Sequence, residues 1–358
     1  RLRQARRRDM ACHGVISARR VNAGIACLTK LEITPPSFSN HSRYGTWRNG
    51  TSGDDTIDLR YQWPWDVKDN ADGGGGDDTI YGNMADNELL GRGGNDLIYG
   101  GTGNDNILGS QGNDVLYGED GHDVLQGGTG WDVLDGGAGN DELIGGADND
   151  SFYGGDGNDY IYDDWDDTTV SGADWMDGGD GNDHIYSFNG NDKIYGRAGD
   201  DVIVISNTDG HNHLSDSSLE IHGGSGSDML VFANDGTVTT FDGLGAHTDG
   251  IESVKLDYGH TMTLNLSAQQ VMAASPTDKL IISGDGSDTL DLTSFLTTRP
   301  SPGEQWLVTG AHNAFDANGL FTSFTTFDYM KDGNVLASVD VENAIHVTVH
   351  DPVTLLSF

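Results

Sequence analysis

The sequence predicts an all-β protein: a parallel β-roll, meaning a flattened β-solenoid with 18 residues per coil, followed by a smaller β-rich C-terminal region. A nine-residue pattern recurs ten times without insertion from Gly73 to Tyr162. Self-similarity at a short fixed period is typical of solenoids. The 53 glycines and a hydrophobic share of only 35% also argue against a thick conventional core.

Each position of the repeat has its own requirement. Glycine at the first, second and fourth positions permits backbone angles that a side chain forbids, and it leaves carbonyl groups uncovered. Positions seven to nine read x-apolar-x, which predicts a three-residue strand with one inward side chain. Six residues of turn and three of strand then form half a coil. The predicted inward residues are Ile80, Ile98, Leu116, Leu134 and Phe152 on one sheet, and Leu89, Ile107, Leu125, Leu143 and Ile161 on the other.

Aspartate occupies the sixth position in nine of these ten copies. Stacked turns bring such residues close together, and the chain already carries a net charge of -38. Carboxylates and exposed carbonyls form an all-oxygen shell, which suits Ca²⁺ better than Mg²⁺ or Zn²⁺. The sequence therefore predicts several bound calcium ions, which supply the cohesion that the sparse core lacks. The predicted side-chain ligands are Asp78, Asp96, Asp105, Asp114, Asp123, Asp132, Asp141, Asp150, Asp159, Asp183, Asp192 and Asp201.

The nonapeptide resembles the repeat of the RTX (repeats-in-toxin, haemolysin-type) calcium-binding proteins, which are exported by type I secretion. The resemblance is specific over residues 73–204. It implies that main-chain carbonyls at the second and fourth positions also bind calcium. By this resemblance the further ligands are Gly74, Gly76, Gly101, Gly103, Gly112, Gly128, Gly130, Gly137 and Gly139. The copy 82–90 departs from the pattern with Ala85 and Asn87, so the site that joins it to Asp105 is expected to be weak or empty.

The repeats divide the chain into six expected segments. Three more copies follow from Gly178 to Val204, and isolated copies occur at 50–58, 223–231 and 283–291. The expected segments are a basic leader (1–48), an isolated repeat with linker (49–72), the main roll (73–162), a spacer (163–177), a second RTX block (178–231) and the C-terminal region (232–358).

The two ends of the chain carry weaker signals. The leader is expected to be disordered or foreign to the native protein, since its arginines lie far from its short, interrupted apolar run. A genuine N-terminal secretion signal is the alternative. Residues 347–358 end in a hydrophobic stretch that resembles an uncleaved C-terminal secretion signal. An ordinary final strand is the alternative.

The C-terminal region is expected to be all-β, with one short helix. Short alternating runs separated by Gly and Asp turns predict strands at 238–241, 253–256, 280–282, 306–308, 335–339 and 345–349. The spacing of Ser267 and Gln270 is that of a capping box, which predicts a helix beginning there and ending before Pro276.

No pattern in the chain indicates catalysis, so no enzymatic activity is expected. The zinc protease signature His-Glu-x-x-His is absent, and residues 223–227 approach the serine nucleophile motif but end in Ser. His211 and His213 have no third metal ligand at suitable spacing. The acidic composition disfavours nucleic acid as a partner. The lack of about 18 consecutive apolar residues excludes a spanning helix.

One surface feature suggests a ligand. Tyrosine recurs at the ninth position of alternate copies, at Tyr81, Tyr99, Tyr117 and Tyr153. A flat ladder of aromatic rings could stack on sugars. The plainer alternative is that tyrosine is a favoured strand residue.

These observations predict an extracellular, secreted or surface-associated protein that folds on binding calcium after export through the type I secretion machinery. A surface, matrix or adhesion role, with polysaccharide or a cell surface as partner, is the favoured expectation. The alternative is the calcium-binding secretion module of an exported enzyme, polysaccharide-modifying or hydrolytic, whose catalytic domain lies outside this sequence.

Overall fold

The computed structural model describes residues 18–20, 26–28, 47–60, 69–163, 172–188, 190–207, 219–234, 240–241, 248–256, 262–275, 279–284, 288–293, 304–315, 321–331, 334–342 and 345–349. The chain divides into two compact units, Arg1–His41 and Ser42–Phe358. Within the first unit, β1 (Ala18–Arg20) pairs antiparallel with β2 (Ala26–Leu28). Most of the expected leader lies outside the described residues, so the expectation of disorder there stays a prediction.

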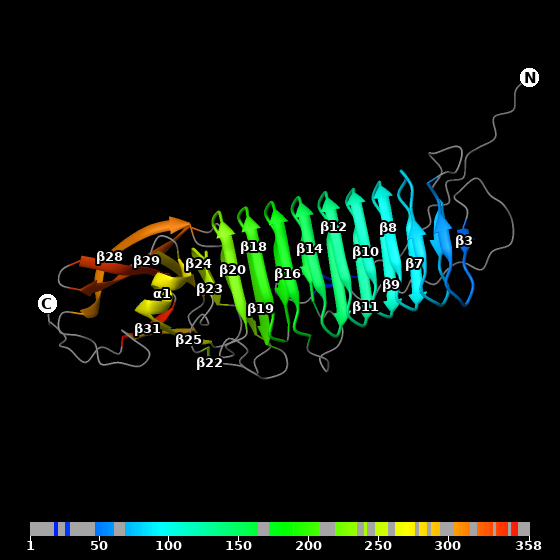
Figure 1. Cartoon of the computed structure of the whole chain (residues 1–358). Coiled ribbons are helices and arrows are strands. Elements are labelled where there is room, and N and C mark those ends of the chain that lie inside the picture. Colours follow the sequence, from blue (N-terminus) through cyan, green and yellow to red (C-terminus); the bar gives the residue numbers. More distant parts are fainter. Residues whose placement is uncertain are drawn as a thin grey trace, which may run out of the picture. The chain divides into compact units, whose positions relative to one another are not determined.

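The second unit is built on two long sheets, and most successive strands of the roll alternate between them (Figure 1). Sheet I contains β4 (Thr56–Asp58), β6 (Thr79–Tyr81), β8 (Leu97–Thr102), β10 (Val115–Asp120), β12 (Val133–Ala138), β14 (Ser151–Asp156), β16 (Trp175–Asp180), β18 (Lys193–Ala198), β20 (Glu220–Ser225) and β23 (Thr248–Asp249). Sheet II begins with β3 (Trp47–Asn49), β5 (Asn70–Asp72), β7 (Glu88–Gly93), β9 (Asn106–Gln111), β11 (Val124–Thr129), β13 (Glu142–Ala147), β15 (Tyr160–Tyr162), β17 (His184–Ser187), β19 (Val202–Asn207) and β21 (Met229–Asn234).

The strand register confirms the predicted parallel β-roll with 18 residues per coil. Leu116 in β10 pairs with Ile98 in β8 and with Leu134 in β12, each 18 residues away. All ten predicted inward side chains are fully buried in one continuous core between the sheets. One apolar residue per nine thus suffices to line both inner faces, although the resulting core is thin.

The strands are longer than the predicted three residues. Most span six, because pairing continues through the glycine-rich positions, as in Glu119 with Gly101 and Asp120 with Thr102. Each strand continues across the residue between these paired stretches. The prediction of six turn residues per half coil was therefore wrong.

Part of the expected spacer, residues 163–177, belongs to the roll. β16 begins at Trp175 and pairs with β14, which brings Met176 beside Phe152 in the core. The backbone N–H of Asp150 donates to Oδ1 of Asp174, a separation of 24 residues in place of 18. The inserted residues therefore lengthen one connection without shifting the register, which a search for the strict consensus could not detect.

The C-terminal region extends the roll. β24 (Ser253–Leu256), β26 (Lys279–Ser283) and β30 (Asn334–Glu342) continue sheet II in parallel, and β29 (Phe321–Lys331) and β28 (Glu304–Phe315) add antiparallel strands at its end. A further parallel sheet, sheet III, contains β22 (Thr240–Phe241), β25 (Thr263–Ser267), β27 (Thr289–Thr293) and β31 (His346–Val349). An antiparallel end strand of different length stops the regular stacking of coils.

The predicted helix is confirmed as α1 (Ala268–Ala274). Ser267 caps it: its side chain accepts from the Gln270 backbone N–H, and the Gln270 side chain accepts in return from the Ser267 backbone N–H. All six predicted C-terminal strands overlap observed ones, but β23, β25 and β29 were missed, and β27 was indicated only by the isolated copy at 283–291. Within the described part of the chain, no helix has the length and hydropathy that a membrane span requires.

Candidate metal centres in the stacked turns

The sixth-position aspartates form two rows along the turns that lead into the two sheets. Each of these side chains is at most 3% exposed. The row leading into sheet I is Asp78, Asp96, Asp114, Asp132, Asp150, Asp174 and Asp192, and the row leading into sheet II is Asp105, Asp123, Asp141, Asp159, Asp183, Asp201 and Asp228. All twelve aspartates predicted from the sequence therefore lie in these rows.

One carboxylate oxygen of each aspartate joins neighbouring coils. The backbone N–H of Asp96 donates to Oδ1 of Asp114 at 2.7 Å, and that of Asp114 donates to Oδ1 of Asp132 at 2.7 Å. The same bond recurs along both rows, including at the isolated copies 50–58 and 223–231, where Asp78 and Asp228 accept. This ladder fixes every carboxylate in one orientation.

In ten of these aspartates the second carboxylate oxygen is buried and accepts no hydrogen bond. This holds for Oδ2 of Asp78, Asp96, Asp114, Asp123, Asp132, Asp141, Asp159, Asp183, Asp201 and Asp228. Leaving a charged acceptor buried without a donor costs on the order of several kcal/mol of folding free energy. Native proteins rarely contain even one such group. A row of such atoms indicates that a ligand from solution completes the site.

Glycines shape the space around these oxygens. A Cβ on Gly118 would lie 2.5 Å from Oδ2 of Asp123 and 2.5 Å from the carbonyl oxygen of Gly136, so a side chain at this first position would crowd the carboxylate. The nine glycines predicted as carbonyl ligands (Gly74, Gly76, Gly101, Gly103, Gly112, Gly128, Gly130, Gly137 and Gly139) have φ between +97° and +149°. These angles are strained for other residues. The turns thus combine buried carboxylate oxygens with uncovered carbonyls.

Burial changes the protonation of these carboxyl groups. Loss of hydration raises the pKa of Asp114 to about 7 and that of Asp96 to about 6, although the backbone hydrogen bond to each opposes the shift. The same cause raises the pKa of Asp159 and Asp183 to about 7. At neutral pH the metal-free turns therefore hold charges that the fold does not compensate. A hard divalent cation with several oxygen ligands fits this donor set.

Three carboxylates converge where the strict repeat is interrupted. Ligand oxygens of Asp163, Asp174 and Asp192 all lie within 4.8 Å of one another, and the three residues are buried. Asp192 was predicted as a ligand, whereas Asp163 and Asp174 were missed. Asp174 carried a usable signal, since Gly172 stands two residues before it and an x-apolar-x triplet follows.

In the copy with Asn87, protein groups supply hydrogen bonds to both polar atoms of the side chain, so no ion is needed there. Nδ2 of Asn87 donates to the carbonyl oxygen of Asp69 at 2.7 Å and to Oδ1 of Asn83 at 3.2 Å. Its Oδ1 accepts from the Asn83 backbone N–H at 2.8 Å. An amide supplies donors that a carboxylate lacks. This arrangement supports the expectation of a weak or empty site towards Asp105, which stays a prediction.

The fifth position forms a second ladder that sequence reasoning missed. The backbone N–H of Trp131 donates to Oδ1 of Asn113 at 2.9 Å, and that of Asn113 donates to Oδ1 of Asn95 at 2.8 Å. Here the side chain of one coil accepts from the following coil, opposite to the aspartate ladder. The frequent Asn at this position was the available signal. Each turn is thus tied in both directions.

The predicted sugar-stacking tyrosines have a different geometry from the one expected. The rings of Tyr81, Tyr99 and Tyr117 stack on one another, with centroids 5.1 and 5.0 Å apart and interplanar angles of 5° and 8°. The outer face of Tyr81 is covered by the Arg60 guanidinium, 3.9 Å from the ring centroid. Most ring faces are therefore turned to neighbours, which argues against sugar stacking on them. Tyr153 stands apart, between Asp135 and Asp177 in register.

Together the parallel roll and its rows of buried aspartates define a cation-binding repeat protein. The family model of the RTX calcium-binding nonapeptide repeat matches in four copies, at residues 68–98, 99–130, 126–161 and 168–203. Residues 68–203 therefore carry RTX calcium-binding nonapeptide repeats. No curated protein matches the chain at a level that indicates a relationship. His211 and His213 lie outside the described residues.

Proposed function

We propose that this chain is an extracellular protein whose repeats fold when they bind calcium after export. The observation that carries the proposal is the row of buried carboxylate oxygens without hydrogen-bond donors. Binding energy released at such oxygens is folding energy, because the sites do not exist in the unfolded chain. Low cytosolic calcium would keep the chain unfolded for type I secretion, and the higher extracellular concentration would order it.

The ions would lie between successive coils. Sixth-position carboxylates from two stacked turns and carbonyls of the second and fourth positions would hold each ion, as with Asp105, Gly101 and Gly103. The cluster of Asp163, Asp174 and Asp192 would form a further site with an additional carboxylate. A bound ion neutralises the stacked charges and joins neighbouring coils.

A calcium titration followed by far-ultraviolet circular dichroism tests this function. Metal-stripped full-length chain at pH 7.5 is expected to show little β-structure, and millimolar calcium is expected to induce a cooperative gain. Magnesium at the same concentration should be a much weaker inducer, because it demands a small octahedral shell. An identical β-rich spectrum in chelator and in calcium would contradict the proposal.

The biological role we propose is that of a surface, matrix or adhesion component without enzymatic activity. The outward faces of the sheets support it, since the repeats leave these long surfaces available to partners. The alternative is a secretion module that serves an exported enzyme. Hydrolysis or epimerisation of polysaccharides by the purified, calcium-loaded chain would overturn the non-enzymatic role.

Asn87→Asp tests whether the amide replaces an ion. The substitution removes the bond from Nδ2 to the Asp69 carbonyl and buries a new charge. At the lowest calcium concentration that folds both chains, we expect a loss of about 1–3 kcal/mol in stability, as for other buried polar groups that lose their partners. Saturating calcium should recover most of this loss, and thermal melts at the two calcium concentrations measure it. Equal destabilisation at both concentrations would show that Asn87 does not affect calcium binding.

A further inference from the structure

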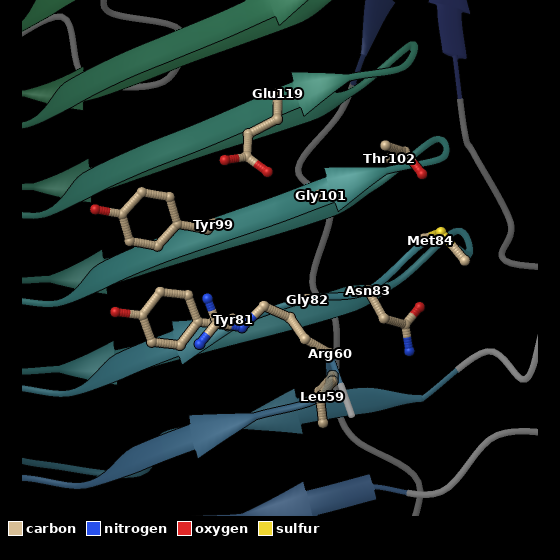
Figure 2. A pocket seen from close by; sticks show the side chains of 10 residues that line it. All are labelled: Leu59, Arg60, Tyr81, Gly82, Asn83, Met84, Tyr99, Gly101, Thr102 and Glu119. Atoms are coloured by element: carbon tan, nitrogen blue, oxygen red, sulfur yellow. The ribbon is translucent and has the colours of Figure 1, made fainter. Parts of the chain in front are cut away.

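A hollow of about 380 Å³ lies on the outward face of sheet I, near its N-terminal end. Tyr81 and Tyr99 stand on one side of it, and Met84 and Thr102 on the other, with the backbone of Gly101 between them (Figure 2). Sites for small ligands usually measure about 300–1,000 Å³. This hollow is therefore of the size that one or two sugar rings need.

The fold keeps the hollow open. Gly101 pairs in register with Glu119, and its φ of +113° disfavours any side chain. A Cβ there would also overlap the carbonyl oxygen of Asn83. Asn83 and Glu119, which flank Gly101 in the neighbouring coils, carry side chains, whereas Gly101 leaves a gap between them. The stacked rings of Tyr81 and Tyr99 make the adjoining wall rigid, so little ordering is needed on binding.

The charges around the hollow select against ions. Arg60 lies at one end and Glu119 at the other (Figure 2). Arg60 already makes a two-bond ion pair with Asp58, at 2.8 and 3.0 Å. The strongly negative chain repels polyanions, and the lining offers a cation only one carboxylate, that of Glu119. An uncharged ligand is left as the best match.

The lining also selects for hydroxyl groups beside aliphatic surface. Tyrosine ring edges and the 60% exposed Met84 provide apolar contact. The Thr102 hydroxyl and the Glu119 carboxylate can bond to hydroxyl groups. Since most ring faces are covered, a flat aromatic ligand would find little to stack on, whereas a pyranose ring can use the ring edges. We propose that this hollow binds one or two units of a neutral glycan.

The proposal goes beyond calcium-dependent folding but requires the folded roll, so it is tested on calcium-saturated full-length chain. The probes are three neutral trisaccharides (maltotriose, cellotriose and chitotriose) and acidic trigalacturonate, titrated calorimetrically. We expect at least one neutral probe to bind and trigalacturonate to bind at least tenfold more weakly. Binding of no neutral probe, or tighter binding of trigalacturonate, would overturn the proposal.

Thr102→Trp should fill the hollow and weaken the neutral probe at least tenfold. Thr129→Trp is the matched control, because Thr129 is also exposed and occupies the same third position of its repeat, at the end of β11 in sheet II, away from the hollow. Met84→Ser, at an exposed position, should weaken binding at least threefold and serves if Thr102→Trp does not fold. Equal binding by wild type and the folded variants would refute the site. A chain that fails to fold in calcium would instead refute the proposed function.

Discussion

The double substitution Asp114→Asn with Asp132→Asn is expected to raise the calcium concentration at the folding midpoint at least tenfold. These residues are stacked neighbours in the row leading into sheet I, and both have a buried Oδ2 without a donor. Asparagine retains the Oδ1 that accepts from the preceding coil, so the ladder bonds at 2.7 Å can persist. What is lost is charge and ligand oxygen. A tenfold shift corresponds to about 1.4 kcal/mol.

The same variant is expected to be more stable than wild type in chelator at pH 7.5. Removing two buried, uncompensated charges relieves the metal-free fold. Asp120→Asn with Asp156→Asn is the matched control. Both residues are exposed at the third position of their repeats, on strands of the same sheet, and the change in net charge is equal. A calcium titration followed by circular dichroism measures the folding midpoint, and the β-content of each chain in chelator measures the metal-free stability. If the two double variants behave alike, net charge and not the buried row determines the calcium response.

The roll could be predicted from sequence because the residues that determine the shape of a coil recur in every copy of the repeat. Glycine positions and one apolar residue per nine fix the coil length, and the observed register of Ile98, Leu116 and Leu134 follows. The insertion before Asp174 was hidden because extra loop residues leave the strand register intact. Strand β25 is short and lies outside the repeat, where no period supports an alternating run.

The site could be predicted only in part, for a related reason. The consensus identifies residues that every coil needs, such as Asp105, but the cluster with Asp163 depends on a single coil. Likewise, the stacking of Tyr81 on Tyr99 depends on ring orientation, which strand periodicity does not specify. The hollow beside them exists because Gly101 carries no side chain between neighbours that do, a property of three stacked coils and not of one repeat.

Lowering the pH is expected to stabilise the metal-free fold in part, as calcium does. In the metal-free fold, burial raises the pKa of Asp114, Asp159 and Asp183 to about 7, whereas an unfolded aspartate titrates near 3.9. Between about pH 4 and 7 the folded state therefore binds more protons than the unfolded state. Its stability rises as pH falls through this window and is lost as pH rises towards 7. Metal-stripped protein should thus gain β-structure between pH 7.5 and 5.

Circular dichroism of the metal-stripped chain across this range measures the effect, with light scattering to detect precipitation near the isoelectric point of about 4.2. The calcium-saturated chain is the control, and its β-content should change little from pH 7.5 to 6, because bound cations already compensate the carboxylates. The Asp114→Asn and Asp132→Asn variant should gain less on acidification than wild type, since two of the titrating groups are gone. A metal-stripped chain whose β-content falls on acidification would show that the buried aspartates do not oppose folding, and the proposed reason for its calcium dependence would be wrong.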